Sequence, residues 1–147
     1  GCEIISELKE GLKDAIICSS HKIYGPQTTD LNLQLRKNGI DEIFVAGMSA
    51  NLCVESHIRH LLECGFKVNA IKDATAGALL PIGDGYESAL INFNFICSSV
   101  ITTKEFCKKQ SRNKSRNKSR NKSRNKSRNK SRNKSRNKSR NKSRKNL

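Results

Sequence analysis

The chain has 147 residues, a length typical of a single domain. Its net charge of +16 is unevenly divided: residues 1–110 carry 11 Lys and Arg against 13 Asp and Glu, whereas residues 111–147 carry 18 Lys and Arg and no acid. The first part is thus an ordinary globular sequence. We find neither a secretory signal nor an apolar run near the ~18 residues of a membrane helix, so we expect a cytoplasmic protein that does not bind membranes.

The first part of the chain also holds all of the cysteines. None of the six belongs to a C-x-x-C pair, and Cys18 and Cys97 lie inside apolar, strand-like runs. A disulfide framework would require a small secreted chain. We therefore expect free thiols that pack as small apolar side chains, Cys18, Cys64 and Cys97 among them.

The chain opens with helix and strand signals. Apolar residues at helical spacing predict a short amphipathic helix over 2–12, and the run DAIICSS predicts a buried strand over 14–20. The segment 21–30 contains Gly-Pro and reads as a loop. A second helix is predicted over 28–39, ending at Gly39.

Strands and helices then alternate. In chain order, the patterns predict a strand over 40–47, a helix over 51–65, a strand over 66–74, a loop over 74–86, a helix over 87–95 and a strand over 96–103. This alternation favours an α/β fold with a parallel sheet covered on both faces. Sites of such sheets lie beyond the C-terminal ends of the strands, here the loops 21–25, 47–53 and 72–77.

The tail is a simple repeat. The tetrapeptide SRNK occurs eight times over residues 111–142, and no apolar residue precedes Leu147. Such a segment cannot bury surface to offset its chain entropy, so we expect residues 111–147 to be disordered. Its charge would support unspecific, salt-sensitive binding to nucleic acid or acidic surfaces. An expanded repeat without a function of its own is the alternative that we favour.

Cys53, His57, His60 and Cys64 share one face of the predicted helix 51–65 and resemble a metal site. At a rise of about 1.5 Å per residue, however, the two cysteines are roughly 16 Å apart along the axis. One zinc ion holds its ligands at about 2.0–2.3 Å, so it cannot bind all four. We expect no metal here, and interpret the two histidines as a polar stripe or a helix–helix contact.

Cys53 itself falls at the first turn of a helix that leaves the C-terminal end of a strand. Free N–H groups and the helix dipole favour a thiolate there, and the same groups can hold an oxyanion. This placement predicts a nucleophile. An activating partner is available on loop 21–25 in either His21 or Lys22, and the residues alone do not choose between them.

The pattern HK-x-Y-G…TDL…LRKNGID…AGMSANLCVESHIRHLLECGFKV…KDATAG…ALINF…VITT resembles the isochorismatase-like cysteine hydrolases over about residues 1–106. The resemblance implies a Rossmann-like α/β/α sandwich with six parallel strands and an Asp-Lys-Cys triad. Cys53 matches the nucleophile and Lys22 the triad lysine. A cis peptide is implied at Met48–Ser49, with the N–H groups of Ser49 and Cys53 as the oxyanion hole.

The implied reaction is hydrolysis of an amide-like C–N bond of a small molecule through a thioester on Cys53. No cofactor is implied, and a homo-oligomer is compatible with the family. Tyr24 and the loop 79–86 are candidates for contacting the substrate.

The sequence departs from the family pattern at the triad aspartate, for which it has no counterpart. Asp14 is the first residue of the predicted strand 14–20 and belongs at the opposite sheet edge from Lys22. The first two strands of the family's sheet would precede Gly1. We therefore expect residues 1–110 to be a partial hydrolase domain, followed by the tail 111–147, and a catalytically inactive fragment is the alternative to an enzyme.

Overall fold

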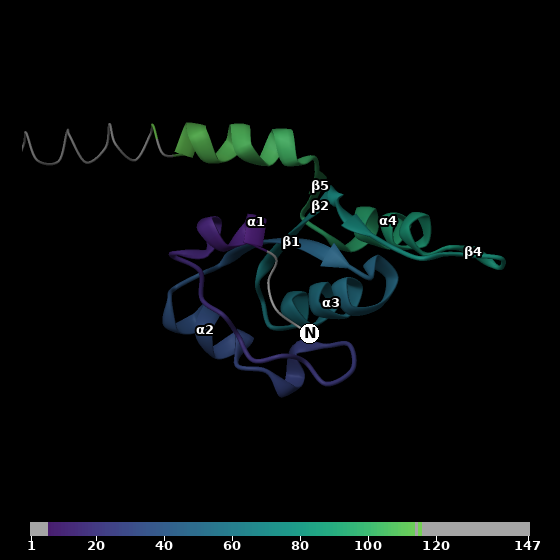
Figure 1. Cartoon of the computed structure of the whole chain (residues 1–147), viewed down its shortest axis with the longest axis horizontal. Helices are drawn as coiled ribbons and strands as arrows, with labels where there is room; N and C mark the ends of the chain where they lie inside the picture. The colour runs from purple at the N-terminus through teal and green to yellow at the C-terminus, as the bar shows by residue number, and fades with distance from the viewer. Residues whose placement is uncertain (1–5, 114, 116–147) are drawn as a thin grey trace, which may run out of the picture. The chain divides into compact units, whose positions relative to one another are not determined.

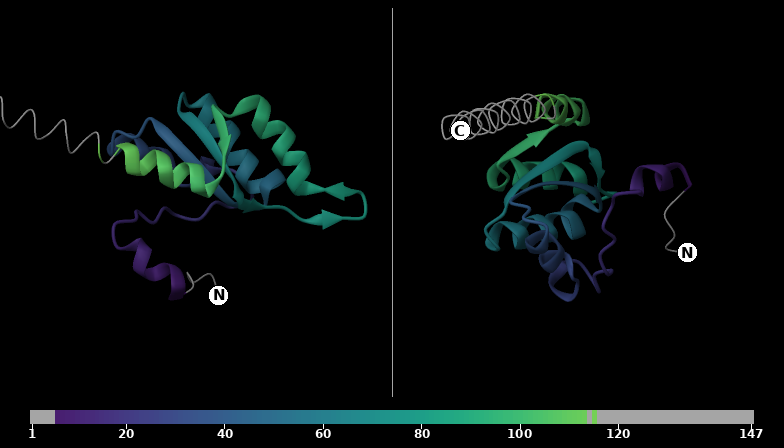
Figure 2. Two further views of the ribbon diagram at one scale, coloured as in Figure 1. Left: turned by 90° about the horizontal axis from the view of Figure 1, so that it is seen from above. Right: turned by 90° about the vertical axis from the view of Figure 1, so that its left-hand side faces the viewer.

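Two compact units, Gly1–Thr103 and Lys104–Leu147, make up the computed structural model of the chain. The structure describes residues 6–113 and 115. The first unit alternates strands and helices, as Figure 1 and Figure 2 show. In the second unit residues 104–113 are helical, which includes the start of the basic repeat. The rest of the tail for which we predicted disorder lies outside the described residues.

The elements of the first unit lie close to the predicted ranges. They are α1 (Ser6–Lys9), η1 (Glu10–Leu12), η2 (Pro26–Thr28), α2 (Leu31–Lys37), β1 (Glu42–Met48), η3 (Ala50–Val54), α3 (Glu55–Glu63), β2 (Lys67–Ala76), β3 (Leu79–Leu80), β4 (Gly83–Asp84), α4 (Gly85–Ile96) and β5 (Ser99–Ile101). Within the described part of the chain, no helix is long and apolar enough to cross a membrane.

Three of the strands form one parallel sheet in the order β1-β2-β5. Ile43 of β1 lies opposite Val68 of β2, and Ala70 of β2 lies opposite Val100 of β5. β-branched and apolar residues fill these strands, and α3 and α4 supply the connections that parallel strands require. The predicted α/β class with a parallel sheet is therefore confirmed.

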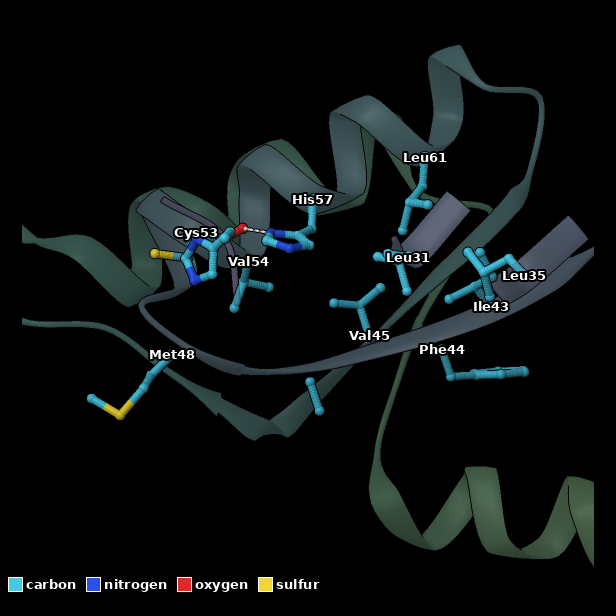
Figure 3. A pocket seen from close by; sticks show the side chains of 12 residues that line it. Leu31, Leu35, Ile43, Phe44, Val45, Met48, Cys53, Val54, His57 and Leu61 are labelled. Atoms are coloured by element: carbon cyan, nitrogen blue, oxygen red, sulfur yellow. Dashed lines mark hydrogen bonds between the residues drawn. The ribbon is translucent and has the colours of Figure 1, made fainter. Parts of the chain in front are cut away.

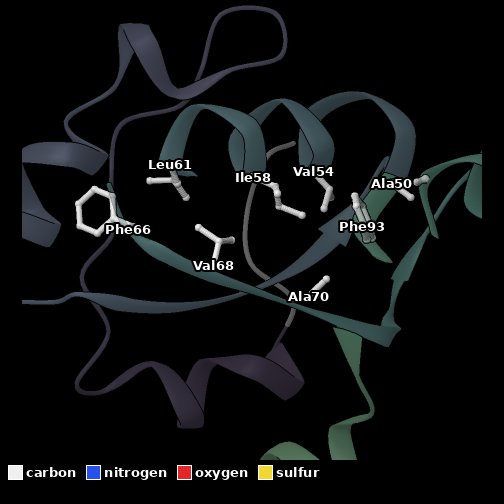
Figure 4. Packing of buried hydrophobic residues seen from close by; sticks show 9 residues of the cluster. Ala50, Val54, Ile58, Leu61, Phe66, Val68, Ala70 and Phe93 are labelled. Atoms are coloured by element: carbon white, nitrogen blue, oxygen red, sulfur yellow. The ribbon is translucent and has the colours of Figure 1, made fainter. Parts of the chain in front are cut away.

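The hydrophobic core lies between this sheet and the helices α3 and α4 (Figure 4). Ile58 of α3, Val68 of β2 and Phe93 of α4 are completely buried. Leu31 and Leu35 of α2 pack against the same cluster. The core thus fixes α3 and the turn η3 directly before it, which carries the candidate nucleophile.

Glycines end two helices as predicted. Gly39 follows α2 with φ of +62°, and Gly65 follows α3 with φ of +81°. Backbone of this left-handed form carries a steric cost for residues with a Cβ, so glycine is the favoured residue at such helix ends. Phe66 donates its N–H to the carbonyl of Leu61 and turns the chain into β2.

The strand predicted over 14–20 is wrong. Residues 15–20 have no strand structure, and the side chains of Ile16 and Ile17 are 51% and 76% exposed. A strand exists only where a neighbour completes its hydrogen-bond ladder. Among the described residues none pairs with this segment. Its end is held instead by Asp30, whose Oδ1 accepts hydrogen bonds from the N–H and hydroxyl of Ser19 at 2.8 and 3.1 Å.

The loop predicted over 74–86 is only partly a loop. β2 continues to Ala76, and β3 and β4 then form a short antiparallel hairpin. Leu80 pairs with Gly83 across the two-residue turn Pro81–Ile82. Strands of two residues are too short for period-two alternation to reveal them, so the Pro and Gly signals dominated the sequence pattern.

Asp30 joins α2 to the segment that precedes it, and we expect this contact to be acid-sensitive. Hydrogen bonds from the Gln34 side chain and from Ser19 lower the pKa of Asp30 to about 2. Because this pKa lies below the ordinary value of about 3.9, the contact stabilises the fold above pH 4 and is lost as the pH falls toward 2. We expect the difference in Tm between the wild type and Asp30→Asn to shrink over that interval in thermal unfolding followed by circular dichroism.

Gln34→Ala, which removes one of the donors to Asp30, should move this loss of stability to higher pH. A Tm difference between the wild type and Asp30→Asn that stays constant from pH 4 to pH 2 would contradict the role assigned to the carboxylate.

Candidate active site

The turn that carries Cys53 begins where β1 ends. The peptide bond Met48–Ser49 is cis, as predicted. The chain then enters the π-helical turn η3, in which the carbonyl of Ser49 accepts hydrogen bonds from the N–H groups of Leu52 and Val54, both at 3.1 Å. Ala50 and Val54 are buried and anchor the turn on the core. Cys53 therefore lies at the C-terminal edge of the sheet, at the start of the helical run that continues into α3.

A pocket of about 310 Å³ opens beside this turn (Figure 3). Cys53, His57 and Met48 lie at one end of it, and the rest of its lining is largely apolar. The apolar side chains come from α2, β1, η3 and α3, namely Leu31, Leu35, Ile43, Val45, Val54 and Leu61. A concave apolar site with a few polar groups at one end is typical of a small-molecule pocket.

The Cys53 side chain is half-buried, and its thiol points toward the carbonyl of Ile23 at 3.8 Å. His57, one helical turn later, places Nδ1 2.7 Å from the carbonyl oxygen of Cys53, the dashed line in Figure 3. This contact orients the His57 ring inside the pocket. Cys53 and His57 thus lie together at this end of the pocket, and the role of Cys53 as a nucleophile stays a prediction.

The loop 21–25 brings His21 to the pocket. Its ring lies edge-on to that of His57, with the ring centroids 5.2 Å apart and the planes at 87°. Nδ1 of His21 is buried and has no hydrogen-bond partner in the structure. The i,i+4 spacing of Cys53 and His57 was a usable sequence signal for this end of the pocket, but the pairing of His21 with His57 depends on the path of the loop.

Lys22 is placed differently from His21. It is exposed and does not line the pocket, and its backbone N–H donates to the hydroxyl of Thr28 at 3.3 Å. Its role as the triad lysine stays a prediction. Tyr24 also stays a prediction as a substrate contact: it lines a second hollow of about 270 Å³, together with Asn51, Leu52 and Arg59.

The remaining histidine and cysteine of α3 form a helix–helix contact, one of the two roles predicted for the histidines. His60 Nε2 lies 2.8 Å from the side-chain nitrogen of Asn32 on α2 and 3.4 Å from Cys64 Sγ. In the described part of the chain, no group of three or more His, Cys, Asp and Glu side chains could hold a metal ion.

Within residues 6–113, the cysteines outside the pocket are free, as predicted: Cys18, Cys64, Cys97 and Cys107 form no disulfide, and Cys2 lies outside the described residues. The first three are half-buried rather than fully buried. Burial raises the pKa of the Cys97 thiol to about 11, and burial together with Asp30 raises that of Cys18. Both thiols therefore stay protonated at neutral pH, which agrees with a packing role.

Iodoacetamide labelling tests the protection of Cys97. Because its pKa is about 11, only about one molecule in 10³ carries the thiolate at pH 8. We expect its alkylation to be about 100-fold slower than that of a peptide cysteine of ordinary pKa, as followed by mass spectrometry of tryptic peptides. The exposed Cys107 of the same chain serves as the internal comparison. Equal rates for the two cysteines would show that Cys97 is not protected.

The fold and the turn together define a parallel α/β protein with a cysteine-bearing strand-to-helix turn at the C-terminal edge of its sheet. The family model described as the isochorismatase domain matches residues 1–105. The chain therefore belongs to the isochorismatase family, and the resemblance of its sequence motifs is confirmed.

Similar proteins agree with this assignment. The chain is 29% identical over 115 residues to YddQ, an uncharacterized isochorismatase family protein of Bacillus subtilis. The matched region covers 74% of this chain and 63% of YddQ. It is 39% identical over 51 residues to the nicotinamidase of Escherichia coli, covering 35% of this chain and 24% of that enzyme. A crystal structure of a cysteine hydrolase from Pseudomonas syringae matches with a TM-score of 0.64 and 28% identity, over 71% of this chain and 52% of the other. The chain thus spans less than two thirds of the length of each of these relatives.

Proposed function

We propose that the chain supplies the nucleophilic part of a hydrolase that cleaves an amide-like C–N bond of a small molecule, with Cys53 as the nucleophile. The observation that carries this proposal is the position of Cys53, in the helical turn at the C-terminal end of β1 and at one end of an apolar pocket. Membership of the isochorismatase family and the similarity to a nicotinamidase support an amide as the substrate class.

The proposed reaction proceeds in two steps. A base removes the thiol proton of Cys53, and the sulfur attacks the carbonyl carbon of the amide. The N–H groups of Ser49 and Cys53 stabilise the oxyanion. The C–N bond then breaks, the proton passes to the leaving amine or ammonia, and a thioester remains on the sulfur. Water hydrolyses the thioester to the carboxylic acid and restores the thiol.

The base is the incomplete part of the site. The side chains that line the pocket within the described residues include His21 and His57 but no carboxylate. Lys22, on the adjoining loop, is the lysine that we propose to stabilise the developing anion. Among the described side chains that line the pocket, His21 and His57 are the groups that we propose to accept this proton. Nδ1 of His21 is buried without a hydrogen-bond partner, and Nδ1 of His57 lies against the carbonyl oxygen of Cys53, so its Nε2 can be protonated without breaking that hydrogen bond.

The experiment offers the full chain a panel of small primary amides, nicotinamide included, and measures ammonia release together with the intact mass of the protein. We expect either turnover or an acyl adduct that maps to the tryptic peptide containing Cys53. An adduct without turnover would indicate that the thiol attacks but that the proton transfers are incomplete. Absence of both ammonia and adduct with every amide would reject the proposal.

A further inference from the structure

His60 and Cys64 lie together at the C-terminal end of α3, away from the pocket. They are four residues apart and therefore share one face of the helix, of which Cys64 is the C-cap. Sγ of Cys64 lies 3.4 Å from Nε2 of His60, and the thiol forms no disulfide. Cysteine sulfur and histidine nitrogen are the ligands that zinc prefers in proteins. The pair thus supplies two ligands of a possible zinc site, and such a site needs at least one more.

The third group comes from α2. The side-chain amide of Asn32 places Nδ2 2.8 Å from Nε2 of His60 and 3.4 Å from Sγ of Cys64. Its Oδ1 is buried and has no hydrogen-bond partner among the described residues. A half-turn of the amide exchanges these two atoms and directs the unpartnered oxygen at the sulfur and the imidazole. Side-chain carbonyl oxygen is a ligand that metal ions accept, so three ligands from two helices meet at one point.

The spacing of the three groups is close to that of a tetrahedral metal site. Zinc holds nitrogen and oxygen at about 2.0–2.2 Å and sulfur at about 2.3 Å, which separates sulfur from nitrogen by about 3.5 Å. The 3.4 Å between Sγ of Cys64 and Nε2 of His60 agrees with this separation. A nitrogen and an oxygen ligand are about 3.3 Å apart in such a site, so the amide of Asn32 would move outward by about 0.5 Å. Binding an ion therefore requires no rearrangement of α3.

We propose that Asn32, His60 and Cys64 form a zinc site that joins α2 to α3, with a water molecule as the fourth ligand. The Cys64 thiol releases its proton to the solvent as its sulfur binds the ion. All three side chains are half-buried, which leaves the ion a path from solvent. Arg36 does not occupy these ligands, because its guanidinium donates to the carbonyl oxygen of Cys64 and lies 4.3 Å from the centre of the Phe66 ring.

The other Cys–His pair of the same spacing is arranged differently. Nδ1 of His57 lies 2.7 Å from the carbonyl oxygen of Cys53, and the Cys53 thiol points toward the carbonyl of Ile23 (Figure 3). The expectation that α3 binds no metal rested on the side chains of that helix alone, whereas Asn32 lies on α2. The zinc site does not depend on the activity of Cys53, since none of its three ligands lines the pocket.

Titration of the full, reduced chain with Co²⁺ tests the site, because Co²⁺ substitutes for zinc and its bond to a thiolate absorbs in the near ultraviolet. We expect one equivalent of Co²⁺ to produce this absorption band and added zinc to displace it. Cys64→Ser should abolish the band, and His60→Ala should weaken binding at least about tenfold. Cys53→Ser removes the cysteine of the other pair; it is the matched control and should keep the band.

Asn32 allows a test in both directions. Asn32→Asp replaces the amide by a carboxylate, a stronger zinc ligand, and should tighten binding about tenfold, whereas Asn32→Ala should weaken it. Zinc should also raise the Tm of the wild type but not of Cys64→Ser, because an ion that binds only the folded chain stabilises it.

Three results would overturn the proposal: no thiolate band with Co²⁺, a band that survives Cys64→Ser, or an Asn32→Asp variant that binds no more tightly than the wild type. Circular dichroism of each metal-free variant distinguishes lost binding from lost folding. A band that disappears with Cys53→Ser instead would assign the metal to the pocket and reject the site between α2 and α3.

Discussion

Phe93→Ala is expected to lower the free energy of unfolding by about 3–5 kcal/mol, the range observed when a buried phenylalanine is truncated in a core. Phe93 is completely buried and belongs to the cluster that joins α4 to α3 and the sheet. Its removal leaves a cavity in the cluster that also holds the completely buried Ile58 and Val68. Urea denaturation measures the loss, with a lower midpoint and an unchanged slope.

Phe95→Ala is the matched control for this experiment. It removes the same side chain from the same helix, two residues further on, but at a position that is 84% exposed. The effect of Phe95→Ala on the free energy of unfolding should stay within about 0.5 kcal/mol. If the two alanine variants were equally stable, the core assigned to the inner side of α4 would be wrong.

Local signals were sufficient for much of the fold. β1, α3, β2, α4 and β5 all lie within the predicted ranges or extend them by a few residues. In these elements the apolar residues on which the prediction rested are buried, as Val68, Ala70 and Ile71 are along β2. The glycines after α2 and α3 are local signals as well, because a positive φ is a property of single residues.

The segment 14–20 is a case in which local sequence signals predict the wrong structure. Its run of Ile and Cys satisfies the pattern of a buried strand as well as β1 does, yet it is not a strand in the structure. A strand is defined by its neighbour, and the neighbour is not encoded in the segment itself. The hydrogen bonds from Ser19 to Asp30 fix its end, and they involve a residue eleven positions away.

Some features of the candidate site could likewise be predicted from the sequence, and others could not. The position of Cys53 after a strand was predicted from the pattern of strand and helix, and the cis peptide at Met48–Ser49 was implied by the resemblance of this short motif to the family. The edge-on contact of His21 with His57 and the place of Tyr24 beside a separate hollow were not, because they depend on how the loop 21–25 folds against α3. The loop path is set by packing between elements and could not be read from its residues.

Cys53→Ser is expected to reduce amide hydrolysis, and formation of the acyl adduct, by at least about 10³-fold, since loss of a catalytic nucleophile commonly costs this much or more. The serine hydroxyl is nearly isosteric with the thiol but ionises far less readily, so the turn should keep its geometry while the nucleophile is lost. The rate of adduct formation, followed by intact mass with a simple activated ester, measures the attack itself, because such an ester needs no proton on its leaving group.

Cys64→Ser is the control on the same stretch of helix: Cys64 touches His60 and Asn32 but does not line the pocket. The Cys64→Ser variant should form the acyl adduct and hydrolyse the amide at the rates of the wild type. Comparing the two variants distinguishes loss of the nucleophile from damage to the pocket, because both variants keep the apolar lining and the two histidines. Were Cys53→Ser to acylate as fast as the wild type, another group would have to be the nucleophile, and the strand-to-helix turn would then have a structural role only.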